Sequence, residues 1–226
     1  MKPLARMVTL AAAALALTGA APKTIGWTHT VVVTPDGGHL IGNPAAPVRV
    51  TEFTSYTCAD CASFTIQSDS VLQIGYIASG KVAVELRHLV QNPVDQAAAM
   101  LADCGLPERF ALNHSALMRS HERWRNTMDR AGPAQKQRWN AGSLLARGRA
   151  IADDMGFYRI MESRGFSRSA TDACLGNAAL AKRIGEQSKA GYALGIKSVP
   201  SFLINGTLLE SAHSWAELRP LIDASL

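Results

Sequence analysis

The chain has 226 residues, 47% of them hydrophobic, and a formal net charge of +5. This length and composition fit one globular domain, or one domain with a large insertion, whose core does not depend on disulfide scaffolding. The densest basic region, residues 119–149, is interrupted by Glu122 and Asp129 and holds only two aromatic residues. We therefore expect a solvated helix face there and no nucleic-acid partner.

Residues 1–21 have the pattern of a secretory signal peptide. Lys2 and Arg6 precede an uncharged, Ala-rich stretch that ends in small residues. An uncleaved membrane anchor is the alternative, but the stretch is short against the roughly 20 apolar residues of a spanning helix. We expect a mature chain of residues 22–226, located in the periplasm. Four cysteines lie in that mature chain, where thiols can persist as disulfides.

The first half of the mature chain alternates between strand and helix patterns. Residues 28–34 are rich in β-branched side chains and are followed by turn-forming residues, which predicts a first strand. Residues 48–54 predict a second strand. From Cys58 the apolar spacing becomes helical up to Gly80, and residues 81–90 alternate again. The order predicts a β-α-β unit whose third strand follows the helix.

The second half is mostly helical until its last 30 residues or so. Helix patterns run from Val94 to about Gly191, which is too long for one crossover helix. We therefore expect an inserted helical subdomain at about residues 95–175, and a last helix that returns to the sheet. Residues 201–204 and 207–209 flank Asn205-Gly206, a hairpin signal. Ser214 and Glu217 form a capping box that opens a terminal helix.

The segment SYTCADCASF places Cys58 and Cys61 at the start of the first helix. Unpaired N–H groups at a helix N-terminus stabilise a thiolate, so Cys58 is expected to be the attacking sulfur and Cys61 the resolving one. The same spacing occurs in zinc sites and structural bridges. We expect no metal, because no His lies within ten residues of the pair and Cys104 and Cys174 are 70 residues apart. A bridge over so small a loop would stabilise little.

Taken together, three segments resemble the thioredoxin fold in its DsbA-like form: GNPAAPVRVTEF, YTCADCASF and SVPSFLING. The resemblance implies an α/β thioredoxin-like fold with a helical subdomain inserted after the third strand. It also implies that Cys58 and Cys61 are the active pair and that Pro200 is the family's cis-proline. The backbone of Val199 would then be free to bind a substrate peptide as an added strand.

The resemblance assigns a role to Glu52 and departs from the family between the two cysteines. Glu52 matches a buried acid that helps to move the proton of the resolving thiol, although an exposed strand residue is an equal alternative. The DsbA oxidase has Pro-His between its cysteines, whereas this chain has Ala59-Asp60. A carboxylate there disfavours the Cys58 thiolate. We expect a Cys58 pKa above the value of about 3.5 in the strong oxidases, and a less oxidising pair.

Cys104 and Cys174 lie in the predicted helical insertion. Some exported DsbA-like proteins have a second, structural disulfide between two helices of the insertion, and the resemblance implies such a bridge here. The alternative is two buried free thiols.

The expected function is that of an exported thiol–disulfide oxidoreductase that forms, reduces or reshuffles disulfides in protein substrates. It needs no cofactor, and a membrane redox partner of DsbB or DsbD type would restore its redox state. We expect a monomer. One alternative is a binding protein that holds Cu(I) between Cys58 and Cys61. Another is a chaperone that uses only an apolar groove around Phe64, Val199 and Phe202.

Overall fold

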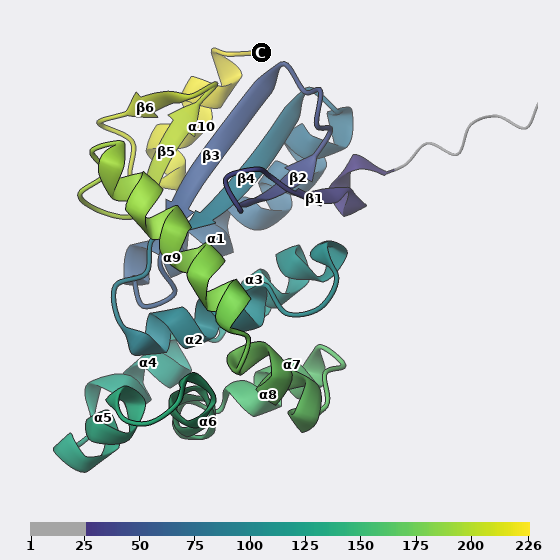
Figure 1. Ribbon diagram of the computed structural model, residues 1–226. Coiled ribbons are helices and arrows are strands. Elements are labelled where there is room, and N and C mark those ends of the chain that lie inside the picture. The colour runs from purple at the N-terminus through teal and green to yellow at the C-terminus, as the bar shows by residue number, and fades with distance from the viewer. Residues whose placement is uncertain (1–25) are drawn as a thin grey trace, which may run out of the picture.

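The computed structural model describes residues 26–226, so the predicted signal peptide lies outside the described residues. Its centre is a six-stranded sheet in the order β1-β2-β4-β3-β5-β6 (Figure 1). The strands are β1 (Val31–Val33), β2 (His39–Gly42), β3 (Val48–Thr54), β4 (Val82–His88), β5 (Ser201–Ile204) and β6 (Thr207–Leu209). Only the central pair, β3 and β4, is parallel; the other neighbours are antiparallel.

The central parallel pair is connected by the helix that the cysteine pair opens. After β3 the chain enters α1 (Ala59–Val71), which continues as a π-helical turn (Leu72–Tyr76) and a 3-10 turn (Ile77–Ser79). Gly80 ends this helix in the left-handed conformation, at φ 73°, which costs a residue without a side chain little. The predicted β-α-β unit is thereby confirmed.

Helices cover both faces of the sheet. The helix α10 (Trp215–Asp223) lies beside α1 on one face, where Phe64 packs against Phe202 and Trp215. The helix α9 (Ala178–Ala193) crosses the other face (Figure 1), and Gly191 brings it against Phe53. β3 is therefore buried on both sides, which holds the residue that follows it in a defined position.

A group of seven helices is inserted between β4 and α9 and lies beyond one end of the sheet (Figure 1). These helices are α2 (Pro93–Ala102), α3 (Phe110–Arg119), α4 (His121–Asp129), α5 (Pro133–Asn140), α6 (Leu144–Met155), α7 (Phe157–Ser163) and α8 (Arg168–Leu175). A short 3-10 turn, Pro107–Arg109, precedes α3. The predicted fold class, a thioredoxin-like α/β fold with an inserted helical subdomain, is confirmed.

The N-terminal strands differ from the prediction. Residues 28–34 were expected to form one strand, but the chain makes a 3-10 turn (Trp27–His29) and then the three-residue β1. The sequence analysis missed β2, because all four of its residues are buried and show no alternation. The helical insertion therefore follows the fourth strand along the chain.

The C-terminal elements have the predicted bounds. Asn205 and Gly206 have φ values of 49° and 84°, as a type I′ hairpin turn requires. The Ser214 side chain accepts a hydrogen bond from the backbone N–H of Glu217 and caps α10. Within residues 26–226, no helix is both long enough and apolar enough to span a membrane.

Candidate active site

Side chains from two of the inserted helices hold the loop between β3 and α1 in place. The carboxylate of Asp95, buried at the start of α2, accepts hydrogen bonds from Ser55 Oγ at 2.6 Å and from the Tyr56 backbone N–H at 2.7 Å. Arg125 of α4 donates to the carbonyl oxygen of Thr57 at 2.8 Å. These contacts determine where α1 begins, and therefore where Cys58 lies.

Cys58 is the N-cap residue of α1, and its half-buried sulfur accepts a hydrogen bond from the backbone N–H of Cys61 at 3.2 Å. Its pKa is lowered to about 7. The main cause is a hydrogen bond from the Cys61 thiol, and the backbone N–H groups of Cys61 and Asp60 add to it. Burial acts in the opposite direction. A substantial fraction of Cys58 is therefore thiolate at neutral pH, which is the nucleophilic form.

Cys61, three residues further along, has the opposite character. Its side chain is fully buried, and burial together with the neighbouring Cys58 raises the pKa of the thiol well above its ordinary value. When Glu52 is ionised, its charge raises the Cys61 pKa further. The pair thus contains one accessible thiolate and one protected thiol, as the attacking and resolving roles require.

The chain approaches Cys58 a second time at residues 199–200. The Val199-Pro200 peptide bond is cis, and the Cys58 thiol donates to the Val199 carbonyl oxygen at 3.3 Å. Val199 is half-buried and Pro200 is buried. His213, which the sequence analysis missed, has its ring Nδ1 at 2.9 Å from the Pro200 carbonyl oxygen. Two segments about 140 residues apart in sequence, α1 and the proline loop, therefore meet at one sulfur.

Glu52 is buried at 3% exposure on β3, so the exposed alternative is wrong. Burial raises its pKa to about 8, and the charges of Asp69 and Cys58 contribute. Its Oε1 atom has no hydrogen-bond partner among the described residues. At neutral pH this carboxyl is therefore mostly protonated and able to exchange a proton.

Ala59 and Asp60 are exposed in the first turn of α1. The Asp60 carboxylate raises the Cys58 pKa as expected, but this is the weakest of the contributions. The Asp60 backbone N–H has the opposite effect and lowers it. The pKa of about 7 is well above the roughly 3.5 of the strong oxidases, but the hydrogen bonds to the sulfur determine it more than the carboxylate does.

The remaining predicted residues are the second cysteine pair and two phenylalanines. Cys104 and Cys174 form a disulfide, with Cα atoms 5.7 Å apart, that ties the segment just after α2 to α8. Phe64 and Phe202 are buried, with ring centroids 4.7 Å apart, so they form core rather than a groove. In residues 26–226 no cluster of three or more His, Cys, Asp or Glu side chains is arranged to hold a metal.

A group of polar residues beside Glu52 was not predicted. Thr65 and Asp69 follow Cys61 on α1, and His114 comes from α3. The spacing of Cys61, Thr65 and Asp69, at i, i+4 and i+8, is a signal that they share a helix face. His114 has no such local signal, because only the tertiary fold brings α3 to this position.

Comparison with known proteins agrees with this fold. A protein-disulfide isomerase from Novosphingobium aromaticivorans is 45% identical, with a TM-score of 0.79 over 84% of this chain and 97% of that one. Wolbachia pipientis alpha-DsbA1, 21% identical, has the same fold, with a TM-score of 0.65 over 85% of this chain and 90% of that one.

A curated Rickettsia prowazekii protein, whose name assigns it provisionally to the protein-disulfide oxidoreductases, is 30% identical over 90 residues. That match covers 39% of this chain and only 33% of the relative. The class that the fold defines is the DsbA-like form of the thioredoxin fold, which this chain shares with the two solved structures. A family model described as Thioredoxin matches residues 34–224, and the chain belongs to that family.

Proposed function

We propose that this protein is an exported thiol–disulfide oxidoreductase that acts on cysteine-containing protein substrates through Cys58 and Cys61. The observation that carries the proposal is the position of Cys58 Sγ. It lies 3.2 Å from the Cys61 N–H at the start of α1 and 3.3 Å from the Val199 carbonyl oxygen beside a cis proline. A nucleophilic sulfur and a peptide-binding backbone group therefore lie at the same point.

In the oxidising direction, a substrate thiolate attacks Cys58 of the Cys58–Cys61 disulfide, and Cys61 leaves as a thiolate. A second substrate thiolate then attacks the substrate sulfur of the mixed disulfide. The substrate disulfide forms and Cys58 leaves as a thiolate. Two electrons pass to the protein, and the two protons that the substrate thiols lost return to the active-site sulfurs or to solvent. Reduction of a substrate disulfide is the same sequence in reverse.

Val199 would bind the substrate backbone next to the reacting sulfur. In the dithiol form its carbonyl oxygen accepts a hydrogen bond from the Cys58 thiol. When Cys58 enters a disulfide it loses that proton, and the carbonyl becomes free to accept an N–H from an extended substrate peptide. Pro200 has no N–H of its own to compete for this strand pairing.

Export and the reaction partners follow from the same proposal. The leader pattern of residues 1–21 supports export of a mature domain at residues 22–226, and the Cys104–Cys174 disulfide is of the kind that persists in an oxidising compartment such as the periplasm. A membrane protein of DsbB or DsbD type would then reoxidise or reduce the pair. The protein would act as a monomer.

The test combines peptide oxidation with insulin reduction, using wild type, Cys58→Ser and Ser63→Ala. Ser63 is an exposed residue of the same helix, so the Ser63→Ala variant controls for a change at this surface. We expect activity in wild type and Ser63→Ala and none in Cys58→Ser. Activity that survives Cys58→Ser would contradict the proposal. Tight Cu(I) binding without any exchange activity would favour the metal-binding alternative.

A further inference from the structure

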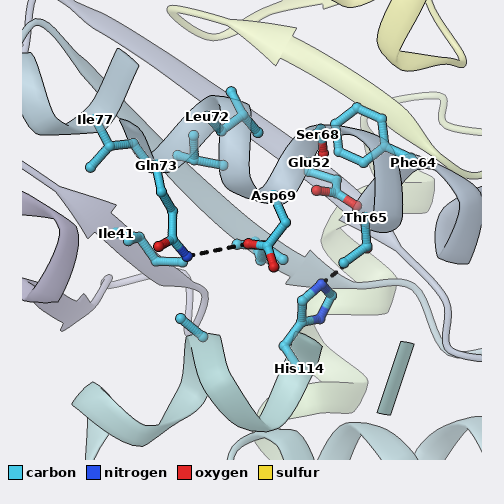
Figure 2. Close-up of a pocket in the computed structure, with 13 residues that line it drawn as sticks. Ile41, Glu52, Phe64, Thr65, Ser68, Asp69, Leu72, Gln73, Ile77 and His114 are labelled. Carbon is cyan, nitrogen blue, oxygen red and sulfur yellow. Dashed lines mark hydrogen bonds between the residues drawn. The ribbon is translucent and has the colours of Figure 1, made fainter. Parts of the chain in front are cut away.

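A small cavity lies between the sheet, α1 and α3; most of its lining is apolar, and a group of polar side chains, Glu52 among them, lines the rest. Its volume is about 40 Å³, enough for one or more water molecules. Three of its lining side chains can ionise: Glu52 of β3, Asp69 of α1 and His114 of α3. Figure 2 shows these three side chains gathered around the cavity. The residues that line it from β2 and β4 are apolar: Ile41, Val84 and Leu86.

His114 is fully engaged in hydrogen bonds and cannot receive a proton easily. Thr65 Oγ1 donates its only proton to the Cys61 carbonyl oxygen at 3.1 Å, so the His114 Nε2 at 3.3 Å from that hydroxyl must be the donor. The other ring nitrogen then accepts from the Tyr56 hydroxyl at 2.9 Å. Burial lowers the His114 pKa to about 4, so the ring stays neutral.

Asp69 connects the cavity with solvent. Its side chain is 24% exposed, whereas the residue Glu52 is 3% exposed. Gln73 donates to its Oδ1 at 3.2 Å, and Ser115 donates to its Oδ2 at 2.8 Å. Arg119 pairs with Oδ2 from the solvent side at 3.2 Å. These three donors fix the carboxylate at the border between the cavity and the surface (Figure 2).

We propose that Asp69 is a positioning residue for proton transfer, whose carboxylate holds water in this cavity and so connects Glu52, and through it the Cys61 thiol, with solvent. The inference rests on the proposed function. When Cys61 attacks a mixed disulfide at Cys58, its proton passes to Glu52 in the fraction of molecules in which that carboxyl is ionised, a fraction that grows as the pH approaches 8. A new bond joins the Cys61 and Cys58 sulfurs, and the substrate sulfur leaves with the electron pair. Glu52 then releases the proton through the cavity water beside Asp69.

Of the charged and titratable groups around Glu52 in the described residues, Asp69 offers the proton a route from the cavity to solvent. Cys58 and Cys61 face it from the start of α1, and they are the reacting groups. His114 faces it from α3 and is held neutral by its two hydrogen bonds. Asp69 is the remaining titratable side chain that lines the cavity within the described part of the chain.

The experiment follows the two exchange steps separately. Reduced protein is mixed with excess glutathione disulfide between pH 5 and 9, quenched with acid, and analysed by mass spectrometry. The glutathione adduct at Cys58 reports the first step, and its decay reports the attack by Cys61. Asp69→Asn removes the charge at constant size, and Asp69→Glu keeps the carboxylate. Asp153→Asn is the matched control, since Asp153 also pairs with an arginine but lies in α6.

In Asp69→Asn we expect the adduct to decay roughly three- to tenfold more slowly at pH 9, where Glu52 is largely ionised in both proteins, a part of the ~10²–10⁴-fold that acid–base transfer contributes. The midpoint of its pH profile should move down, because the Asp69 charge helps to keep Glu52 protonated. The rate of adduct formation should stay within about twofold of wild type in all variants, and Asp69→Glu and Asp153→Asn should decay as wild type.

Unchanged decay and pH profile in Asp69→Asn would overturn the inference while leaving the proposed function intact. Equal slowing in Asp153→Asn would overturn it too, because the effect would then come from lost charge or stability anywhere. If wild type forms no adduct at Cys58, the proposed function itself fails. These outcomes separate the two claims.

Discussion

Cys58 and Cys61 differ in their surroundings although one helical turn separates them. Cys58 Sγ accepts hydrogen bonds from the Cys61 thiol and from the Cys61 backbone N–H at the helix N-terminus, while Cys61 is buried. The hydrogen bonds to Cys58 therefore lower its pKa, and burial raises the pKa of Cys61. In the proposed reaction, this asymmetry allows a mixed disulfide to form at Cys58 and then to be resolved by the protected thiol of Cys61.

The pH at which Cys58 ionises can be measured by alkylation. The rate of reaction of the reduced protein with iodoacetamide should rise with pH around a midpoint near 7. Cys61→Ala should raise this midpoint, because it removes the thiol that donates the hydrogen bond that most lowers the Cys58 pKa. An unchanged midpoint in that variant would show that the Cys61 thiol contributes nothing to the Cys58 thiolate.

The burial of Glu52 leads to a second prediction, which concerns how the stability of the protein depends on pH. The pKa of Glu52 is about 8 in the folded protein and 4.5 ordinarily. Between these pH values the folded state binds more protons than the unfolded state, so the free energy of unfolding falls as the pH rises from 4.5 to 8. Glu52→Gln removes the ionisable group, and with it the cost of charging a buried carboxylate at high pH. In urea unfolding of the reduced protein, the variant's advantage over wild type should grow from pH 5 to pH 9 by on the order of 4 kcal/mol at most. A difference independent of pH would contradict the burial of an ionisable group here.

Among the elements, β3 matters most for the site, since it carries Glu52 and leads directly to Cys58. It is held from one face by the core around Phe64 and from the other by α9. A side chain built on Gly191 would come within 2.6 Å of Leu89 Cδ1 and 2.9 Å of Phe53 Cε1. The helix can approach β3 this closely only because residue 191 has no side chain.

Gly191→Ala should therefore destabilise the protein by about 1–3 kcal/mol through overpacking. Gly185→Ala is the matched control in the same helix, where an added Cβ meets no atom within 4 Å. That variant should be stabilised by roughly 0.5–1 kcal/mol from helix propensity. Chemical denaturation of both variants measures the difference, and equal effects at the two positions would refute the close packing of α9 on β3.

Over the whole molecule, the features that local sequence patterns encode, such as strands and turns, could be predicted from the sequence. The features that arise only from tertiary packing could not. The strand at residues 48–54 and the Asn205-Gly206 hairpin follow from alternation and turn chemistry, and both agree with the structure. β2 was missed because burial on both sides removes alternation. His114 was missed because it reaches the site from a helix about 50 residues after Cys61. The cavity beside Glu52 was therefore beyond prediction.

The redox property of the whole protein depends on how the fold stabilises the Cys58 thiolate. A pKa near 7 resembles that of thioredoxin, about 7, rather than the value of about 3.5 in the strong oxidant. A less stabilised thiolate makes the dithiol form less favoured and the disulfide less oxidising. We therefore predict a pair that is less oxidising than that of the DsbA oxidase.

The most direct test is the equilibrium of the Cys58–Cys61 pair in glutathione redox buffers, followed by mass spectrometry after alkylation. We predict one reversible two-electron transition, absent from Cys58→Ser, at a potential between about −270 and −180 mV, the values of thioredoxin and protein disulfide isomerase. A value near −120 mV would contradict the weak thiolate stabilisation. If Cys58 and Cys61 do not interconvert between dithiol and disulfide, the central claim is wrong.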